Sequence, residues 1–239
     1  LIFMSNYTYS LNDRTITIRY QGNEINYNLL TEPYCKKCSY PISTEDCRWH
    51  HSDMMDRTYA IGLYYPTRRN IQDMLSEHIR NLKSEVIYAE PLGYAMAILI
   101  NERYKELAEI DYVVPIPKHQ VEYKYDNNQR REYNQAEELA KIICNKINKP
   151  IINNLLNKNK SWSQRNRNWY DRWSIPDDVY TINNNIVSEV KGKNILLIDD
   201  VRTSGATASK CAEILKEAGA NKVYLFVAGR DVGDQETLT

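Results

Sequence analysis

Apolar side chains recur along the chain at spacings that predict an N-terminal β-hairpin followed by helices. Apolar and polar residues alternate over residues 15–20 and 24–27, on either side of a glycine-containing turn at residues 21–23. Alternation with a period of two around such a turn is typical of a hairpin. Beyond it, apolar residues three and four positions apart predict two helices, over residues 71–82 and 92–107.

From residue 111 onward the pattern becomes that of strands alternating with helices. Residues 111–116 form a short apolar run, and residues 194–198 form an uninterrupted one, which is typical of a strand covered on both faces. Helices are predicted over residues 133–148 and 207–218, and a last strand over residues 223–228. This order predicts an α/β fold with a parallel sheet and right-handed crossovers.

Composition and charge fit a soluble cytoplasmic protein that does not insert into a membrane. Hydrophobic residues make up 42% of the chain and charged residues 26%. The longest apolar stretch, residues 95–100, is far shorter than the roughly 20 residues that a bilayer span needs, and we expect no secretory leader. Lys plus Arg and Asp plus Glu both total 31, so no global charge favours nucleic acid, although a local basic patch can suffice.

Residues 194–207 carry the clearest chemical signal in the chain. A buried strand leads to two adjacent carboxylates, Asp199 and Asp200, which we expect at the edge of the sheet where α/β proteins bind ligands. A turn rich in hydroxyl groups and a helix start follow, and together they predict a cradle for an anion. Gly205 lets the main chain approach a phosphate closely. The alternative is an ordinary strand–turn–helix connection, with Thr207 at or near the N-cap.

This segment resembles the phosphoribosyl pyrophosphate (PRPP) signature of type I phosphoribosyltransferases. In that family an apolar strand, two acidic residues and a turn rich in threonine and glycine follow one another. The resemblance implies that the acidic pair holds the ribose hydroxyls and that the turn holds the 5′-phosphate. The implied PRPP-binding residues in this segment are Asp199, Asp200, Thr203, Ser204, Gly205, Ala206 and Thr207. Ser204 stands where a second threonine is usual and keeps the hydroxyl.

Two further segments narrow the resemblance to ComF proteins. Residues 112–119 (YVVPIPKH) and 131–136 (REYNQA) look like the VPVP and RGFNQA blocks of that family, with Glu132 in place of a glycine. With them the resemblance extends over most of residues 35–230. It implies that Lys118 faces the pyrophosphate, and that Arg131, with Asn134 and Gln135, offers donors to a phosphate or an acceptor base. The alternatives are a solvated loop lysine and surface polar residues at a helix start.

The polar stretch 157–174 shows no clear period and predicts a long mobile loop. Ser161, Trp162 and Gln164, followed by Arg172, resemble the threonine–glutamine–arginine loop of ComF proteins, although Asn159 sits where an arginine is usual. The resemblance implies a hood that closes over PRPP and excludes water. Interleaved tryptophans and arginines also suit stacking on single-stranded nucleic acid, and simple packing on the domain is the third interpretation.

Cysteines near the N-terminus have the spacing of a metal site. Cys35 and Cys38 form one pair, and Cys47 with His50 forms another of equal spacing, which predicts a closed, structural Cys₃His zinc site. ComF proteins often carry four cysteines here, and His51 competes with His50 for the fourth place. Unpaired cytosolic cysteines are the alternative. We expect the other two cysteines, Cys144 and Cys211, to be core thiols rather than disulfide partners.

Together these features predict two domains and an enzymatic function. Residues 1–58 would form the hairpin and zinc-binding module, and residues 59–239 a domain with the type I phosphoribosyltransferase fold. The resemblance implies transfer of ribosyl-5-phosphate from PRPP, with Mg²⁺, to an unidentified acceptor, which we expect to be a nitrogen nucleophile. No residue stands out as a general base. The alternative is a PRPP- or nucleotide-sensing module associated with single-stranded DNA in DNA uptake or processing. The zinc module would then suit docking of a protein partner.

Overall fold

A four-stranded parallel sheet forms the centre of the computed structural model, in the order β4-β11-β10-β5. Its strands are β4 (Arg57–Tyr64), β5 (Tyr112–Pro115), β10 (Ile195–Arg202) and β11 (Val223–Asp231). This parallel sheet confirms the predicted α/β class and the predicted parallel strand arrangement.

The structure describes residues 7–42, 47, 53–119, 125–126, 129–130, 133–162 and 167–233.

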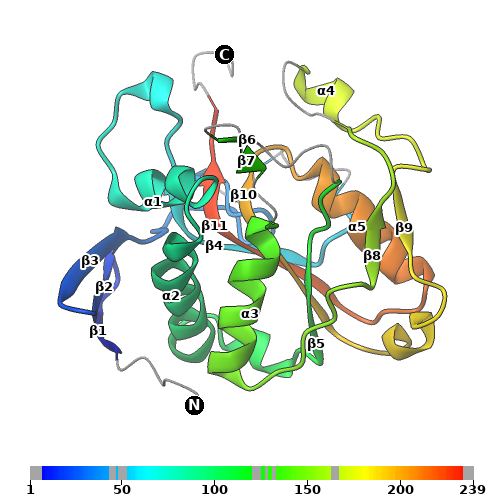
Figure 1. Cartoon of the computed structure of the whole chain (residues 1–239), viewed down its shortest axis with the longest axis horizontal. Coiled ribbons are helices and arrows are strands. Elements are labelled where there is room, and N and C mark those ends of the chain that lie inside the picture. The colour runs from blue at the N-terminus through cyan, green and yellow to red at the C-terminus, as the bar shows by residue number, and fades with distance from the viewer. Residues whose placement is uncertain are drawn as a thin grey trace.

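Helices cover both faces of this sheet (Figure 1). One face is covered by α1 (Met74–Leu82), α2 (Ala89–Glu102) and α3 (Gln135–Ile147), and the other by α5 (Ala206–Glu217). Side chains of β10 alternate between the two layers: Leu196 and Ile198 join the first hydrophobic cluster, and Ile195 and Leu197 join the second. Because both faces of β10 are buried, its sequence is an uninterrupted apolar run.

The helix predicted over residues 92–107 is shorter than its apolar pattern. It ends at Glu102, and Leu107 lies in a separate 3-10 helix, Lys105–Glu109. Leu107 is nevertheless fully buried in the same cluster as α2. Apolar spacing reports burial against the core, so it does not register the break between the two helices.

An antiparallel sheet precedes the parallel one, in the order β1-β2-β3. The predicted hairpin is present as β2 (Thr15–Tyr20) and β3 (Asn23–Asn28). Its two turn residues, Gln21 and Gly22, have φ values of 49° and 77°, as the tight turns that match strand twist require. Strand β1 (Tyr7–Leu11) was not predicted, although Tyr7, Tyr9 and Leu11 alternate with Thr8 and Ser10; none of its five side chains is fully buried.

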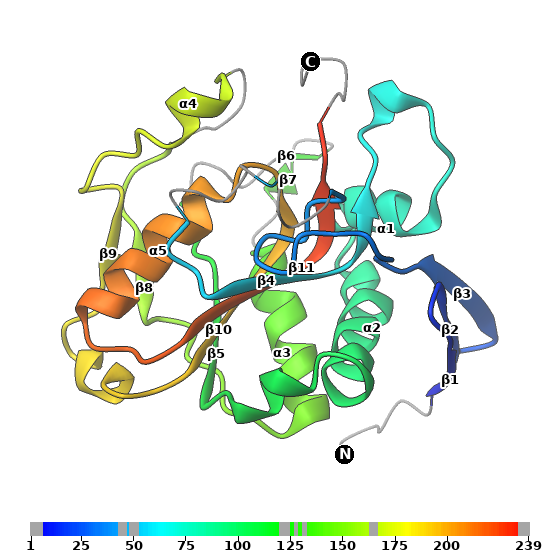
Figure 2. The same ribbon diagram turned by 180° about the vertical axis from the view of Figure 1, so that it is seen from behind.

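The stretch predicted as a long loop contains regular structure at two places. Its start pairs as β8 (Leu156–Lys158) with β9 (Tyr180–Ile182), and a short helix, α4 (Trp169–Arg172), lies between these strands. Elements of three and four residues are too short to leave a period in the sequence. Figure 2 shows α4 on the same side of the molecule as the turn from β10 to α5.

A short strand pair lies in the connection between β5 and α3. Strands β6 (Tyr125–Asp126) and β7 (Gln129–Arg130) form a short antiparallel pair. Within the described residues, no helix has the length and apolar character needed to cross a membrane.

Candidate functional site

The turn between β10 and α5 brings the main chain against a buried arginine. Strand β10 continues through Arg202, so Asp199 and Asp200 lie near its carboxyl end but within the strand. Gly205, with φ at 86°, ends the turn in the left-handed region. A Cβ atom at this position would lie 2.6 Å from Arg202 Cζ and 2.7 Å from Arg202 Nε. Glycine is therefore required here by both conformation and space.

Helix α5 begins without a side chain capping it from its N-cap position. The N-cap is Gly205, and Ser204 Oγ accepts a hydrogen bond of 3.3 Å from the Ala206 N–H. Thr207 lies two positions after the N-cap, inside the first turn. The first N–H groups of a helix have no partners within the helix, and the helix dipole adds partial positive charge there. This helix start is thus suited to an anion.

A pocket of about 170 Å³ opens over this turn. Its lining includes Asp199, the turn residues Thr203, Ser204, Gly205, Ala206 and Thr207, and Arg172 from α4. It is smaller than the roughly 300–1,000 Å³ of typical small-molecule sites, so its size suits a single anionic group. The fold thereby brings the predicted hood arginine, Arg172, to the predicted phosphate turn.

The two carboxylates of β10 influence each other. Loss of water around Asp199, together with the neighbouring Asp200 carboxylate, raises the pKa of Asp199 well above its usual range. The Asp200 N–H donates to Asp199 Oδ1 at 2.9 Å, and the charge of Lys118 opposes the rise. Donors or a cation placed beside this pair would relieve the repulsion between the carboxylates.

The predicted residues of the β5–α3 connection divide between two roles. Lys118 is close enough to Asp199 to affect its pKa, and Lys118 Nζ donates to Gln135 Oε1 at 2.8 Å. Asn134 serves the fold: its Oδ1 accepts from the Ala136 N–H at the start of α3, and its Nδ2 donates to the Ile116 carbonyl at 2.9 Å. Arg131 lies outside the described residues.

In the predicted hood, the aromatic residues contact the domain. Trp162 and Trp173 pack against the hydrophobic cluster on the α5 face of the sheet. Arg167 Cζ lies 4.0 Å from the centre of the Trp162 ring, a cation–π contact, and the Arg167 carbonyl accepts from Arg172 Nε at 3.1 Å. Ser161 is exposed, and Gln164 lies outside the described residues.

Three of the predicted metal ligands come together. The Sγ atoms of Cys35, Cys38 and Cys47 all lie within 4.8 Å of one another, and Cys38 Sγ is 3.6 Å from Cys47 Sγ. Two thiolates bound tetrahedrally to zinc at about 2.3 Å would be about 3.8 Å apart, whereas a disulfide requires about 2.05 Å. The cluster thus has the geometry of a metal site. His50 and His51 lie outside the described residues.

The other cysteines are buried in the core, as predicted. Burial raises the pKa of Cys144 to about 12 and that of Cys211 still further. Both groups therefore stay protonated thiols at neutral pH, which suits packing rather than metal binding.

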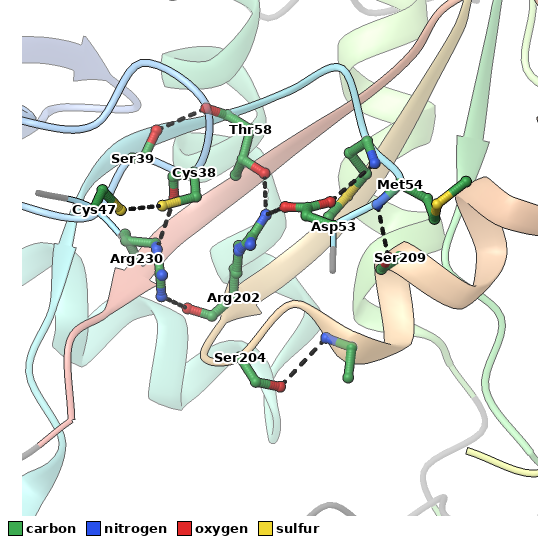
Figure 3. A network of polar contacts seen from close by, with 12 residues as sticks. Cys38, Ser39, Cys47, Asp53, Met54, Thr58, Arg202, Ser204, Ser209 and Arg230 are labelled. Atoms are coloured by element: carbon green, nitrogen blue, oxygen red, sulfur yellow. Dashed lines mark hydrogen bonds and ion pairs between the residues drawn. The ribbon is translucent and has the colours of Figure 1, made fainter. Parts of the chain in front are cut away.

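Two buried arginines beneath the turn were not predicted as site residues (Figure 3). Arg202 Nη1 lies 2.7 Å from Asp53 Oδ2, and both side chains are fully buried. Arg230 Nη1 donates to the Arg202 and Thr203 carbonyls at 3.0 and 2.6 Å. The sequence gives no direct signal for them, because Asp199, Asp200 and Val201 separate Arg202 from the apolar run at residues 194–198, and Gly229 separates Arg230 from the run at residues 223–228. Buried charged residues are retained when they are paired, and these pairings come from distant segments.

No family model matches the chain, but individual proteins do. Amidophosphoribosyltransferase of Pasteurella multocida is 24% identical over 147 residues, 59% of this chain and 24% of that protein. Competence protein F of Haemophilus influenzae is 24% identical over 138 residues, 56% of this chain and 57% of that protein. The chain thus spans a quarter to just over half of the length of these relatives.

Solved structures give a weaker similarity. A glutamine PRPP amidotransferase from B. subtilis aligns over 92% of this chain and 37% of its own, with 14% identity and a TM-score of 0.37. Because that score is low, the assignment rests on the sequence relatives, the signature segment and the parallel sheet. On these grounds the chain is similar in sequence to competence protein F and to amidophosphoribosyltransferases, and its parallel sheet fits the type I phosphoribosyltransferase fold expected from the signature segment.

Proposed function

We propose that this protein binds PRPP with Mg²⁺ at the β10–α5 turn and transfers its ribosyl-5-phosphate group to a nitrogen acceptor. The observation that carries the proposal is the shared pocket. The start of α5, the glycine turn and a carboxyl group of raised pKa line one cavity, together with an arginine from a distant element. The helix start, the turn and the arginine suit the 5′-phosphate, and the carboxyl group beside them suits the ribose.

The 5′-phosphate fits the turn. Main-chain N–H groups at the start of α5 and hydroxyl groups of the turn are the donors that a phosphate requires. The Thr203 hydroxyl, which donates to Asp231 Oδ2 at 3.0 Å in this structure, would be redirected on binding. Arg172 reaches the same pocket and can add a charge-assisted hydrogen bond.

The acidic pair fits the ribose hydroxyls and the cation. Two adjacent carboxylates repel an unaccompanied phosphate, but they accept hydrogen bonds from hydroxyl groups and supply the oxygen ligands that Mg²⁺ prefers. The raised pKa of Asp199 supports this fit, because a bound cation would stabilise its ionised form. When bound, Mg²⁺ would offset the charge of the pyrophosphate, and Lys118 adds a positive charge from the β5 side.

Catalysis in this proposal comes from positioning rather than from a dedicated base. The turn and the acidic pair would hold the two ends of the ribose, while Lys118 would stabilise charge on the departing pyrophosphate. The hood residues Ser161, Trp162, Gln164 and Arg172, with Asn134 and Gln135, would lie on the acceptor side. A cytoplasmic location, where PRPP is available, is part of the same proposal.

One observation supports a second function. Arg167 stacks on Trp162, and its carbonyl accepts from Arg172, which lines the pocket. Such an aromatic–guanidinium pair can also hold bases of single-stranded DNA. A PRPP- or nucleotide-sensing protein in DNA uptake would use this pair without turnover, with a protein partner docked on the cysteine module. Pyrophosphate release from PRPP in the presence of a panel of bases, nucleosides and oligonucleotides separates enzyme from sensor.

The PRPP site is tested by changing both carboxylates. Asp199→Asn with Asp200→Asn should abolish binding of PRPP with Mg²⁺ in calorimetry, because each lost charge-assisted hydrogen bond costs about 1.5–3 kcal/mol. A matched control is the adjacent pair Asp177 and Asp178, which is exposed on the arm before β9. Changing both of these to Asn should leave PRPP affinity unaltered.

Loss of PRPP binding in this variant should not result from unfolding, because the raised pKa of Asp199 means that its ionisation destabilises the folded protein. Asp199 binds its proton more tightly in the folded state, so its contribution to stability is lost as pH rises from about 3.9 through the folded pKa. Above this pH range Asp199 destabilises the unliganded protein, because the unfolded chain ionises this group more readily than the folded one. Asp199→Asn should therefore not lower the Tm of the unliganded protein. If the double variant binds PRPP as tightly as wild type, the proposed site is refuted.

A further inference from the structure

We propose that Arg230 is a positioning residue that couples the cysteine module to the phosphate turn. The cysteine module here means Cys35, Cys38, Cys47 and the turn around them. Metal binding in this module and PRPP binding at the turn would then strengthen each other. The inference rests on the proposed PRPP site and adds to it a regulatory input from the metal.

Arg230 contacts the main chain on both sides. It is 1% exposed, and its Nε donates to the Cys38 carbonyl at 2.8 Å, while Nη1 donates to the Arg202 and Thr203 carbonyls. Figure 3 shows its guanidinium between the cysteine pair and the loop that leads to Ser204. Since these partners are carbonyl groups, the contacts constrain backbone position: a shift of Cys38 displaces the anchor of Thr203.

A second path runs through Thr58. Ser39, the residue after Cys38, donates its hydroxyl to the Thr58 carbonyl at 2.7 Å. The Thr58 hydroxyl accepts from Arg202 Nη1 at 2.5 Å, and Thr58 is fully buried. Arg202 in turn lies directly beneath Gly205, where a Cβ atom would touch its guanidinium. Two chains of contacts, both of which reach Arg202, thus link the cysteine module to the phosphate turn.

Charge adds to the connection at the phosphate side. Arg202 and Arg230 are both buried, and Asp53 forms an ion pair with Arg202. Arg202 Nε and Nη2 are buried and have no hydrogen-bond partner in the part of the chain that the structure describes. Buried charge of this kind is stabilised by anions nearby. The PRPP phosphate would supply such an anion at the pocket that Arg202 lines.

The coupling free energy between two binding sites is reciprocal, so the effect of zinc on PRPP binding and the effect of PRPP on zinc binding can both be measured. Coupling between two sites is typically 5- to 150-fold. Zinc removal should weaken PRPP binding by a factor in this range, measured by calorimetry on the intact chain as purified and after chelation. PRPP with Mg²⁺ should raise zinc affinity by the same factor, measured by competition with a chromogenic zinc chelator.

Arg230→Met tests the route, since methionine retains bulk but cannot donate. The variant should still bind zinc and PRPP, each more weakly than wild type, and the coupling between the two affinities should be smaller than in wild type, because the path through Thr58 remains. Arg80→Met is the matched control: Arg80 donates to the Tyr65 carbonyl outside this network, so its variant should retain the coupling. If Arg230→Met does not fold, Thr58→Val, which removes the Arg202 contact alone, should reduce the coupling.

The outcomes separate the inference from the function beneath it. If wild-type protein binds PRPP but its zinc affinity is the same with and without PRPP, the coupling is refuted and the proposed function still stands. Full coupling in Arg230→Met overturns the role of this residue. Wild-type protein that binds zinc but not PRPP overturns the proposed function and the inference together, and protein that binds no zinc overturns the inference only.

Discussion

Gly205 is the residue at which the phosphate turn depends most directly on atomic space. Its φ is 86°, and the Arg202 guanidinium lies 2.6 Å from the place that a Cβ atom would take, so conformation and space both exclude a side chain. The signature segment in the sequence already marked this glycine, since a close approach to phosphate needs one. The arginine beneath it could be found only from the fold.

Gly205→Ala should therefore weaken PRPP binding and destabilise the protein. A left-handed alanine costs about 1–2 kcal/mol, and overpacking against Arg202 adds about 1–3 kcal/mol. Gly22→Ala is the matched control, because Gly22 also has positive φ but has no atom within 4 Å of a Cβ. Urea unfolding should show a larger loss for Gly205→Ala, and only this variant should bind PRPP more weakly in calorimetry. Equal losses in both would argue against contact with Arg202.

One residue that the sequence did not mark is Arg230, whose partners in the site are backbone groups. Arg230 donates to carbonyls of residues 38, 202 and 203, and a carbonyl is present at every position, so no residue type marks it as a partner. Asn134 shows the converse. Its place in the ComF-like block suggested a ligand contact, whereas in this structure its amide caps α3 and holds the Ile116 carbonyl.

Among the elements, α4 matters most for a role of the predicted hood in binding, because it carries Arg172, which lines the pocket. Helices α3 and α5 were predicted within two residues at each end, because more than ten positions give a clear period, whereas the end of α2 was placed too late and strand β4 was not predicted. The β8–β9 arm and α4 were not predicted either, although they bring Arg172 into the pocket.

We expect Arg172→Ala to lower PRPP-dependent turnover more than stability, since Arg172 can donate a charge-assisted hydrogen bond to an anion in the pocket. Arg167→Ala is the control: Arg167 stacks on Trp162 but is absent from the described lining of the pocket, so turnover should change less. In hydrogen exchange, residues 160–173 should become more protected when PRPP and Mg²⁺ are added, because closure orders the segment. Equal protection with and without ligand would mean that the stretch is packed structure.

At the scale of the whole molecule, the cysteine module and the parallel sheet share one buried polar network, formed by Thr58, Arg202 and Arg230. The hairpin strands also contribute to the core: Ile16, Ile18 and Tyr27 join the cluster formed by α1 and α2. The division at residue 58 remains a proposal, and the response of the protein to metal removal tests it.

We expect one zinc ion per chain, held by Cys35, Cys38, Cys47 and His50. Metal analysis of protein purified without chelator should find it, and Cys35→Ser with Cys38→Ser should abolish it. Cys144→Ala with Cys211→Ala should retain it, because these thiols lie in the core. Hydrogen exchange should show that zinc removal exposes mainly residues up to about 58, since a structural metal contributes folding free energy locally. Loss of protection throughout β10 and α5 would contradict two separable domains.

The sequence by itself determined the α/β class, the hairpin, the phosphate turn and the grouping of cysteines. Each of these depends on residues that are close in sequence or on a regular period, so local chemistry is enough to specify them. Only the tertiary structure decided that Arg172 reaches the phosphate turn and that Arg202 and Arg230 lie beneath it beside the cysteine module. These contacts join segments 28 to 192 residues apart, and what selects them is the burial of charge, which has no signature in the order of residues.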